Sequence, residues 1–217
     1  MRLAVIGGTF NPIHYGHLRA AEEVREALGV DKVLFMPACM PPHKADETGV
    51  DPWARFEMTR LAVEDNPGFE VSDMEIKRGG KSYTVDTVRA LKSGGGADLR
   101  VFLVIGSDSF NDITTWCEYE ELLRTASFVV VSRPGYPVKT PGEALPVELA
   151  RKFWYDSNAG SFTDSDGNTI TYLPTTLFDI SSSGIRSKVR EGRSIRYLLP
   201  GRVEEYIRAN GLYRQAP

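Results

Sequence analysis

The sequence has few cysteines, no long apolar run and little excess charge. Cys39 and Cys117 are the only cysteines in 217 residues, too few for a disulfide framework, so we expect two buried or half-buried thiols. No segment approaches the roughly 18 apolar residues that cross a bilayer, and the opening MRLAVIGGTF lacks the features of a signal peptide. The net charge of −3 argues against a nucleic-acid coat protein. We therefore expect a cytoplasmic protein with neither nucleic-acid nor membrane partners.

Hydrophobic periodicity predicts strands that alternate with helices. The expected strands are short apolar or alternating runs at 2–6, 33–37, 69–76, 100–105, 127–132 and 170–173. The expected helices have apolar residues at helical spacing, at 16–28 (closed by Gly29), 52–64, 84–93, 118–124, 183–191 and 200–209. This alternation predicts an α/β fold, an open and mostly parallel sheet with helices on both faces.

Length and composition predict a single domain over residues 1–217. The polar stretch 151–169 has the character of a surface insertion, and Asp166-Gly167-Asn168 between SFT and TIT predicts a hairpin turn within it. Residues 181–217 should form a small C-terminal helical part. No linker separates two independent domains.

Three loops of unusual composition follow predicted strands, where ligands bind in open α/β sheets. The first is GGTFNPIHYGH at 7–17, whose glycines allow close backbone approach to a ligand. His14 and His17 are three residues apart, so they share one face of a helical first turn. No Cys, Asp or Glu nearby completes a zinc site, which favours phosphate binding at the helix N-terminus. The loop lacks G-x-G-x-x-G, which argues against a dinucleotide-binding dehydrogenase.

The other two loops bring cations and hydroxyls. PPHK at 41–44 supplies His43 and Lys44, although a lysine in a polar loop is usually only solvated. ISSSGIRSKVREG at 180–192 combines three serines with Arg186. That combination fits an anion cradle, or simply an N-cap serine with a surface arginine.

The motifs resemble those of a known superfamily. GGTFNPIHYGH resembles the (T/S)-F-D-P-x-H-x-G-H signature of nucleotidylyltransferases, and ISSSGIR resembles their I-S-S-T-x-I-R signature. PPHK, KSYTVDTVRAL, FLVIGSDSF, Trp116 and the tail YLLPGRVEEYIRANGLY are similar to bacterial nicotinate-nucleotide adenylyltransferases. The resemblance covers nearly the whole chain and implies a Rossmann-like fold. It also implies adenylyl transfer from ATP to nicotinate mononucleotide, giving deamido-NAD and pyrophosphate.

The resemblance further implies roles for individual residues. The residues implied in catalysis are His14, His17, Lys44 and Arg186, with His17 stabilising the pentacoordinate phosphorus and the others holding the ATP phosphates. The residues implied in ATP binding are Gly8, Thr9, Phe10, Gly106, Asp108, and the helix-capping Ser181 and Ser182. Those implied in nicotinate mononucleotide binding are Tyr83, Thr84, Trp116 as a stacking ring, and Arg133. Mg²⁺ is expected on the ATP phosphates, with no metal ligand from the protein.

Asn11 stands where the signature has Asp, which keeps the acceptor oxygen and loses the charge. A turn-capping role survives that change. Two other readings stay open: another adenylyl- or cytidylyltransferase, such as pantetheine-phosphate adenylyltransferase, and a non-catalytic nucleotide-binding module. The sequence leaves the oligomeric state open, a homo-oligomer included.

Overall fold

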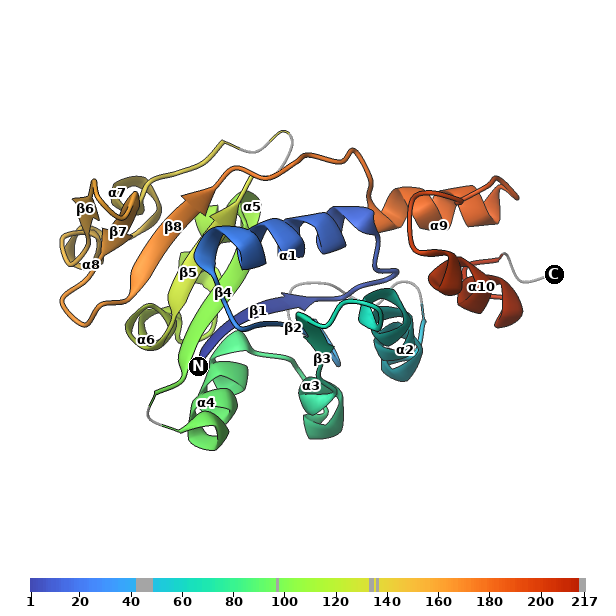
Figure 1. The fold of residues 1–217 in the computed structure, drawn as a ribbon, viewed down its shortest axis with the longest axis horizontal. Helices are drawn as coiled ribbons and strands as arrows, with labels where there is room; N and C mark the ends of the chain where they lie inside the picture. The colour runs from blue at the N-terminus through green and yellow to red at the C-terminus, as the bar shows by residue number, and fades with distance from the viewer. Residues whose placement is uncertain (42–48, 97, 133–134, 136, 215–217) are drawn as a thin grey trace.

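A computed structural model describes residues 1–41, 49–96, 98–132, 135 and 137–214, in which eight strands form one sheet (Figure 1). The strand order is β3-β2-β1-β4-β5-β8-β7-β6. The strands are β1 (Arg2–Gly8), β2 (Lys32–Pro37), β3 (Phe69–Val71), β4 (Arg100–Gly106), β5 (Ser127–Val131), β6 (Trp154–Asp156), β7 (Ser161–Thr163) and β8 (Thr169–Leu173). All neighbours from β3 to β8 pair in parallel, and only β7 and β6 add antiparallel pairs at one edge. The expected open, mostly parallel α/β sheet is confirmed.

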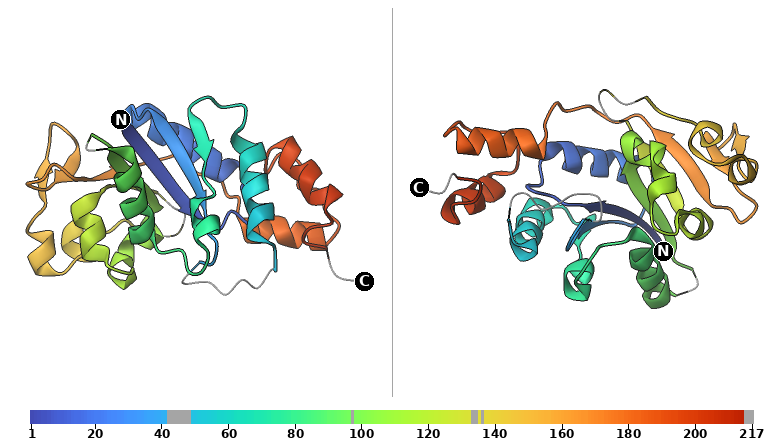
Figure 2. Two further views of the ribbon diagram at one scale, coloured as in Figure 1. Left: turned by 90° about the horizontal axis from the view of Figure 1, so that it is seen from below. Right: turned by 180° about the vertical axis from the view of Figure 1, so that it is seen from behind.

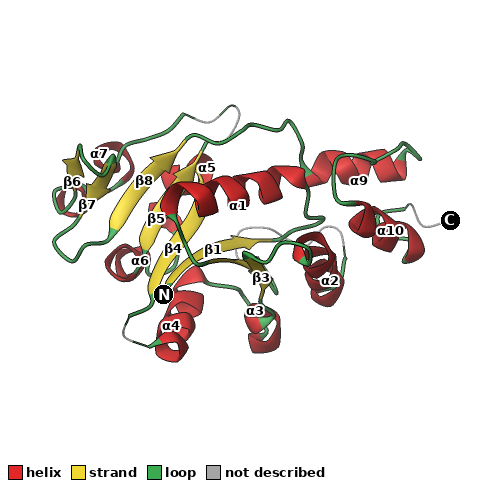
Figure 3. Cartoon of the chain, viewed as in Figure 1, coloured by secondary structure: helices red, strands yellow, loops and turns green. Residues whose placement is uncertain are grey.

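Helices cover both faces of the sheet, as Figures 2 and 3 show. The helices are α1 (Tyr15–Leu28), α2 (Pro52–Val63), α3 (Met74–Arg78), α4 (Thr84–Gly95), α5 (Ser107–Asn111), α6 (Tyr119–Thr125), α7 (Pro141–Ala144), α8 (Val147–Ala150), α9 (Ser182–Arg190) and α10 (Gly201–Ala209), with a 3₁₀ turn at Ile113–Thr115. One core cluster joins the sheet to α1, α2, α9 and α10, and a second joins it to α4 through α8. In β1, Ala4 and Ile6 enter the first cluster while Leu3 and Val5 enter the second. This two-sided burial explains why the strand reads as a continuous apolar run.

The predicted strand at 69–76 is wrong beyond its third residue. β3 ends at Val71, and α3 begins at Met74. The Ser72 hydroxyl accepts a hydrogen bond from the backbone N–H of Met74 at 3.2 Å, which turns the chain out of the sheet. The alternating apolar residues at 69–76 are therefore divided between β3 and α3, because a local side-chain hydrogen bond competes with the hydrogen bonds between strands.

Residues 151–169 form the antiparallel edge of the sheet. β7 pairs with β8 across the predicted hairpin turn, which is confirmed. The buried Asp164 carboxylate accepts from the backbone N–H groups of Asp166 and Asn168, at 2.9 and 2.8 Å, and so builds the turn. Trp154 and Tyr155 on β6 are exposed. That this segment is an insertion stays a prediction.

Two smaller expectations concern features that the sequence lacks. Both cysteines are free thiols, but only Cys39 is half-buried; Cys117 is exposed, so the expectation of two shielded thiols is wrong. Cys117 lies in the turn between the 3₁₀ segment and α6, outside both core clusters. Within the described ranges, no helix has the length and apolar character to span a membrane.

Candidate active site

The strand order changes direction between β1 and β4. From β1 the chain builds outward through β2 and β3, then returns to place β4 on the other side of β1. Ligands of open α/β sheets bind beyond the carboxyl ends of the strands at such a switch point. The loop 9–14 leaves β1 here, and Gly106 ends β4 here. Helix α9 meets the loop 9–14 through hydrogen bonds to the carbonyls of Asn11 and Pro12. The loops predicted at 7–17 and 180–192 thus meet at one edge.

The two histidines form a stacked pair at the start of α1. His14 is the N-cap residue and His17 stands at the third helical position, with ring centroids 3.8 Å apart and planes 27° apart. The backbone N–H of His14 donates to Nδ1 of His17 at 3.3 Å. Because Nδ1 accepts, the neutral imidazole of His17 carries its proton on Nε2. The pairing predicted from the spacing is confirmed, and the hydrogen bond places the proton of the neutral His17 ring on Nε2.

Two glycines allow this packing. A Cβ on Gly16 would lie 3.1 Å from the His14 ring, and a Cβ on Gly8 would lie 2.9 Å from the Phe10 ring. Phe10 is buried with φ of 46°, a left-handed conformation that is uncommon outside glycine, and its ring meets the His17 ring edge-on at 5.2 Å. Any side chain at position 8 would displace that ring. The absence of a side chain at Gly8 therefore leaves the space in which the Phe10 ring packs against His17.

Distant segments fix the loop after β1. Arg186 of α9 donates to the carbonyl of Asn11 at 2.8 Å, and the Ser182 hydroxyl donates to the carbonyl of Pro12 at 2.8 Å. The Tyr213 hydroxyl donates to Oδ1 of Asn11 at 2.5 Å. Asn11 is 5% exposed, so its side chain serves as a buried acceptor. The C-terminal tail and the ISSSGIR segment thus both form hydrogen bonds with the GGTFNPIHYGH loop.

Asn11→Asp should leave the protein folded and active within about threefold of the unmutated rate. A carboxylate oxygen can accept the Tyr213 hydrogen bond as the amide oxygen does. Asn11→Leu is the matched control, because it removes the buried acceptor and should cost about 1–3 kcal/mol of unfolding free energy. Urea unfolding and initial rates at saturating Mg²⁺ and ATP check both variants. A folded but inactive Asp variant would contradict the acceptor role.

Helix α9 presents Arg186 and a capped N-terminus. Arg186 is half-buried, and among the described residues its Nε has no hydrogen-bond partner. The Ser181 hydroxyl accepts from the backbone N–H of Gly184 at 3.1 Å, which is the expected cap. Ser182 does not cap, because its hydroxyl is committed to Pro12. Arg186 thus holds the loop through one N–H donor and has a further N–H donor, at Nε, for which the described residues supply no acceptor.

Arg55 is a site-building residue that the sequence reading missed. It is 1% exposed, and its guanidinium donates to the carbonyls of Thr9 and Cys39 at 2.8 and 2.9 Å. These carbonyls belong to the loops that follow β1 and β2. Arg55 shares the buried face of α2 with Met58 and Thr59. The signal available in the sequence was a single arginine among the otherwise uncharged residues of the buried face of α2.

The remaining ATP-site residues have simpler placements. Gly106 is the last residue of β4 and the N-cap of α5, and Asp108 lies in the first turn of α5. Both therefore lie beside the switch point, and their roles in ATP binding stay predictions. Lys44 and Arg133 lie outside the described residues. Their implied roles stay predictions.

The residues implied in acceptor binding lie at the start of α4 and after α5. Tyr83 is the N-cap of α4, Thr84 is its first residue, and the Tyr83 side chain makes no capping hydrogen bond to this end. The first backbone N–H groups of a helix have no partner within it, and the helix dipole favours an anion there. Trp116 is half-buried against the second core cluster. The predicted helix start at Thr84 is confirmed.

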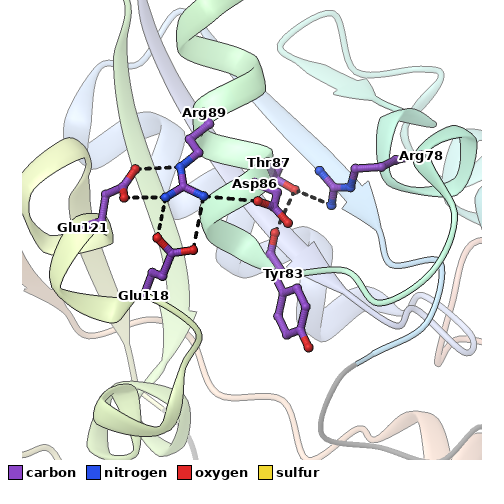
Figure 4. A network of polar contacts seen from close by, with 7 residues as sticks. All are labelled: Arg78, Tyr83, Asp86, Thr87, Arg89, Glu118 and Glu121. Atoms are coloured by element: carbon purple, nitrogen blue, oxygen red, sulfur yellow. Dashed lines mark hydrogen bonds and ion pairs between the residues drawn. The ribbon is translucent and has the colours of Figure 1, made fainter.

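A buried carboxyl supports that helix start. Glu75 of α3 is 6% exposed and accepts a hydrogen bond from the Thr87 hydroxyl at 2.5 Å. Figure 4 shows Arg78 donating to the same hydroxyl. Burial raises the pKa of the Glu75 carboxyl, against the opposing effect of hydrogen bonds from Thr87 and Ser82. Ionising the Glu75 carboxyl therefore costs more free energy in the folded protein than in the unfolded chain.

This raised pKa gives a pH dependence whose sign can be checked. The contribution of Glu75 to the unfolding free energy is fully present below the pKa of an unfolded Glu and is lost as pH rises through the folded pKa. Glu75→Gln does not titrate, so its melting temperature relative to the unmutated protein should rise between about pH 4.5 and neutral pH. Thermal melts over that range measure it, with exposed Glu70→Gln as control. A pH-independent difference would contradict the assignment.

No built metal cage is found in the part of the chain that the structure describes. No cluster of three or more His, Cys, Asp or Glu side chains there is arranged to hold a metal ion. The donors that meet at the switch point are imidazole and guanidinium groups, which suit phosphate oxygens rather than a bare cation. This donor set fits a metal that arrives bound to a polyphosphate.

Comparisons with known proteins identify the family of this chain. A family model described as cytidylyltransferase-like matches residues 5–188. The chain is 50% identical over 216 residues to a protein of Citrifermentans bemidjiense named "Probable nicotinate-nucleotide adenylyltransferase", with all of both chains covered. It is 47% identical over 213 residues to a protein of the same name from Geobacter sulfurreducens, covering 98% of each chain.

Solved structures show the same fold at lower identity. Plasmodium falciparum nicotinic acid mononucleotide adenylyltransferase complexed with NaAD superposes with a TM-score of 0.72 at 16% identity, covering 98% of this chain and 97% of that one. At this identity the likeness concerns the fold, and it supports the Rossmann-like architecture. Family membership comes from the full-length relatives, half identical to this sequence, and from the family model. The chain belongs to the nicotinate-nucleotide adenylyltransferase family, within the cytidylyltransferase-like group.

Proposed function

We propose that this protein transfers the adenylyl group of ATP to nicotinate mononucleotide, releasing pyrophosphate and forming deamido-NAD. The observation that carries the proposal is the His14–His17 pair at the switch point of the sheet, in the loop to which Arg186 is hydrogen-bonded. The names of the full-length relatives support the choice of substrates.

The chemistry needs positioning and charge stabilisation rather than a protein nucleophile. A 5′-phosphate oxygen of the mononucleotide attacks the α-phosphorus of ATP in line, and the bond to the pyrophosphate oxygen breaks. The attacking group is already an anion, so no general base is required. Catalysis then rests on holding two polyanions and stabilising the charge that develops on the transferred phosphoryl group.

The residues divide that work. His17 donates from Nε2 to an α-phosphate oxygen, because its Nδ1 is held by the His14 backbone. His14 and Arg186 contact the ATP phosphates, with Lys44 as their partner. Mg²⁺ bound to the phosphates neutralises part of their charge when present. Asp108 accepts from a ribose hydroxyl, and Gly106 and the backbone of residues 8–10 pack beside the nucleotide.

The acceptor site follows from the start of α4. Nicotinate carries a carboxylate where nicotinamide carries a neutral amide. Thr84 offers a hydroxyl and, with the following residues, free backbone N–H groups at the positive end of the helix. Trp116 stacks on the pyridine ring, Tyr83 borders it, and Arg133 adds a cation on the acceptor side. A site of donors disfavours an amide, because donor then faces donor.

Catalytic efficiency with nicotinate mononucleotide should exceed that with the amide by at least roughly tenfold, or ~1.4 kcal/mol. The test supplies ATP, Mg²⁺ and three acceptors (the acid mononucleotide, its amide and 4′-phosphopantetheine) and measures pyrophosphate release. Thr84→Val should shrink the ratio by slowing the acid substrate, whereas Trp116→Ala should weaken both mononucleotides alike. Equal efficiency on the two mononucleotides, turnover of the pantetheine alone, or ATP binding without turnover would overturn the proposal.

A further inference from the structure

Arg89 of α4 is the centre of a cluster of carboxylates. Its guanidinium contacts Glu121 at 2.5 and 2.7 Å, Glu118 at 2.5 and 3.3 Å, and Asp86 at 3.4 Å, as drawn in Figure 4. The Arg89 side chain is 42% exposed. One cation therefore serves three anions, and its hydrogen bonds hold the pKa of the Glu121 carboxyl below the usual value.

The cluster joins the two segments that carry the proposed acceptor-site residues. Asp86 lies in the first turn of α4, whose start carries Tyr83 and Thr84. Glu118 lies two residues after Trp116 and adopts φ of 50°, rare for a residue with a side chain. Arg89 thus links the helix whose N-terminus faces the nicotinate carboxylate to the segment that carries the stacking ring.

The charge balance at this place bears directly on an anionic ligand. Three carboxylates and one guanidinium leave a local charge of about −2, and without the guanidinium the charge would be about −3. Asp86 shares the first helical turn with the donors that would bind the nicotinate carboxylate. An uncompensated carboxylate at that position repels an acid and acts far less on a neutral amide.

We propose that Arg89 is a specificity-determining residue, which sets the preference for the acid mononucleotide over the amide by compensating the carboxylates around the start of α4. The inference rests on the proposed function and deepens it. The preference then has two sources. Hydrogen-bond donors at the start of α4 contact the nicotinate carboxylate, and the Arg89 cation reduces the repulsion of that carboxylate by the neighbouring anions. A purely structural link between α4 and α6 would instead affect both acceptors alike.

Arg89→Gln separates these alternatives. The acid-to-amide ratio of kcat/KM should fall about three- to tenfold, as expected for one unit charge acting across a partly solvated site, while the KM for ATP stays within about twofold. Arg60→Gln on α2 is the matched control, because it removes a cation of nearly equal exposure (43%) whose described ion pairs are with Glu57 and Glu64. The ratio should not change in that control. Arg89→Lys keeps the charge and should keep most of the ratio.

Two further measurements test the electrostatic origin. Adding Asp86→Asn to Arg89→Gln should recover at least half of the lost ratio, and raising salt to about 0.5 M should narrow the gap between Arg89→Gln and the unmutated protein. An unchanged ratio in Arg89→Gln, an equal loss for both acceptors, or no recovery in the double variant would overturn the inference while leaving the proposed function intact. Absence of any acid preference in the unmutated protein would overturn both.

Discussion

Replacing His17 by Ala should lower kcat by about 10²–10³-fold, or ~3–4 kcal/mol, while the KM for ATP should change little. The proposed Nε2–H donor acts on charge that develops only in the transition state, so its loss affects turnover more than ground-state binding. The backbone of His14 fixes the tautomer and the direction of this donor. Steady-state kinetics with each substrate varied in turn measure the effect.

His17→Gln is the informative companion variant. The Gln side chain carries both an amide N–H donor and a carbonyl acceptor, so it should recover part of the rate lost in the alanine variant. Thermal melts of both variants control for the loss of the cap at the start of α1. Normal turnover combined with much weaker ATP affinity in His17→Ala would assign the residue to ground-state binding instead.

Arg55→Met should lower the unfolding free energy by about 3 kcal/mol or more and slow turnover at least about tenfold. Hydrogen bonds from a charged donor contribute about 1.5–3 kcal/mol each, and the variant leaves the carbonyls of Thr9 and Cys39 without this partner in a buried setting. The rate falls because the Thr9 carbonyl belongs to the loop that carries the histidine pair. A displacement of about 1 Å at a reacting centre can cost 10²-fold.

Arg60→Met is the control on the same helix. Arg60 is 43% exposed and pairs with Glu57 and Glu64, so its loss should cost less than about 1 kcal/mol. Urea unfolding and single-turnover rates distinguish the two variants. Equal stability losses, or a stable Arg55→Met protein with full activity, would show that the two loops keep their places without the guanidinium.

The sequence predicted those parts of the fold that depend on interactions between residues close together in the chain. The parallel strands β1 and β2 with α1 between them, the left-handed Gly29 that ends α1 and the hairpin before β8 each follow from a few neighbouring residues. The histidine pair belongs to the same class, because helical spacing alone brings the rings together. The resemblance then supplied roles that spacing could not.

Long-range contacts explain what the sequence did not reveal. Arg55 reaches a carbonyl 46 residues away, and Tyr213 reaches Asn11 across 202 residues. Periodicity reports which face of a helix is buried, but not which carbonyl a buried guanidinium meets. The end of β3 was missed for a different reason, since one serine hydroxyl converted an alternating pattern into a turn.

The contacts that fix the loop after β1 also bear on the order of events in folding. Its partners Ser182, Arg186 and Tyr213 lie 170, 175 and 202 residues further along the chain. Contacts of such sequence separation form late, because the entropy of closing long loops is lost before they contribute stability. Pairing of β1 with β2 needs far shorter closure. Recovery of activity should therefore lag behind recovery of the circular dichroism signal when the unfolded chain is returned to native conditions.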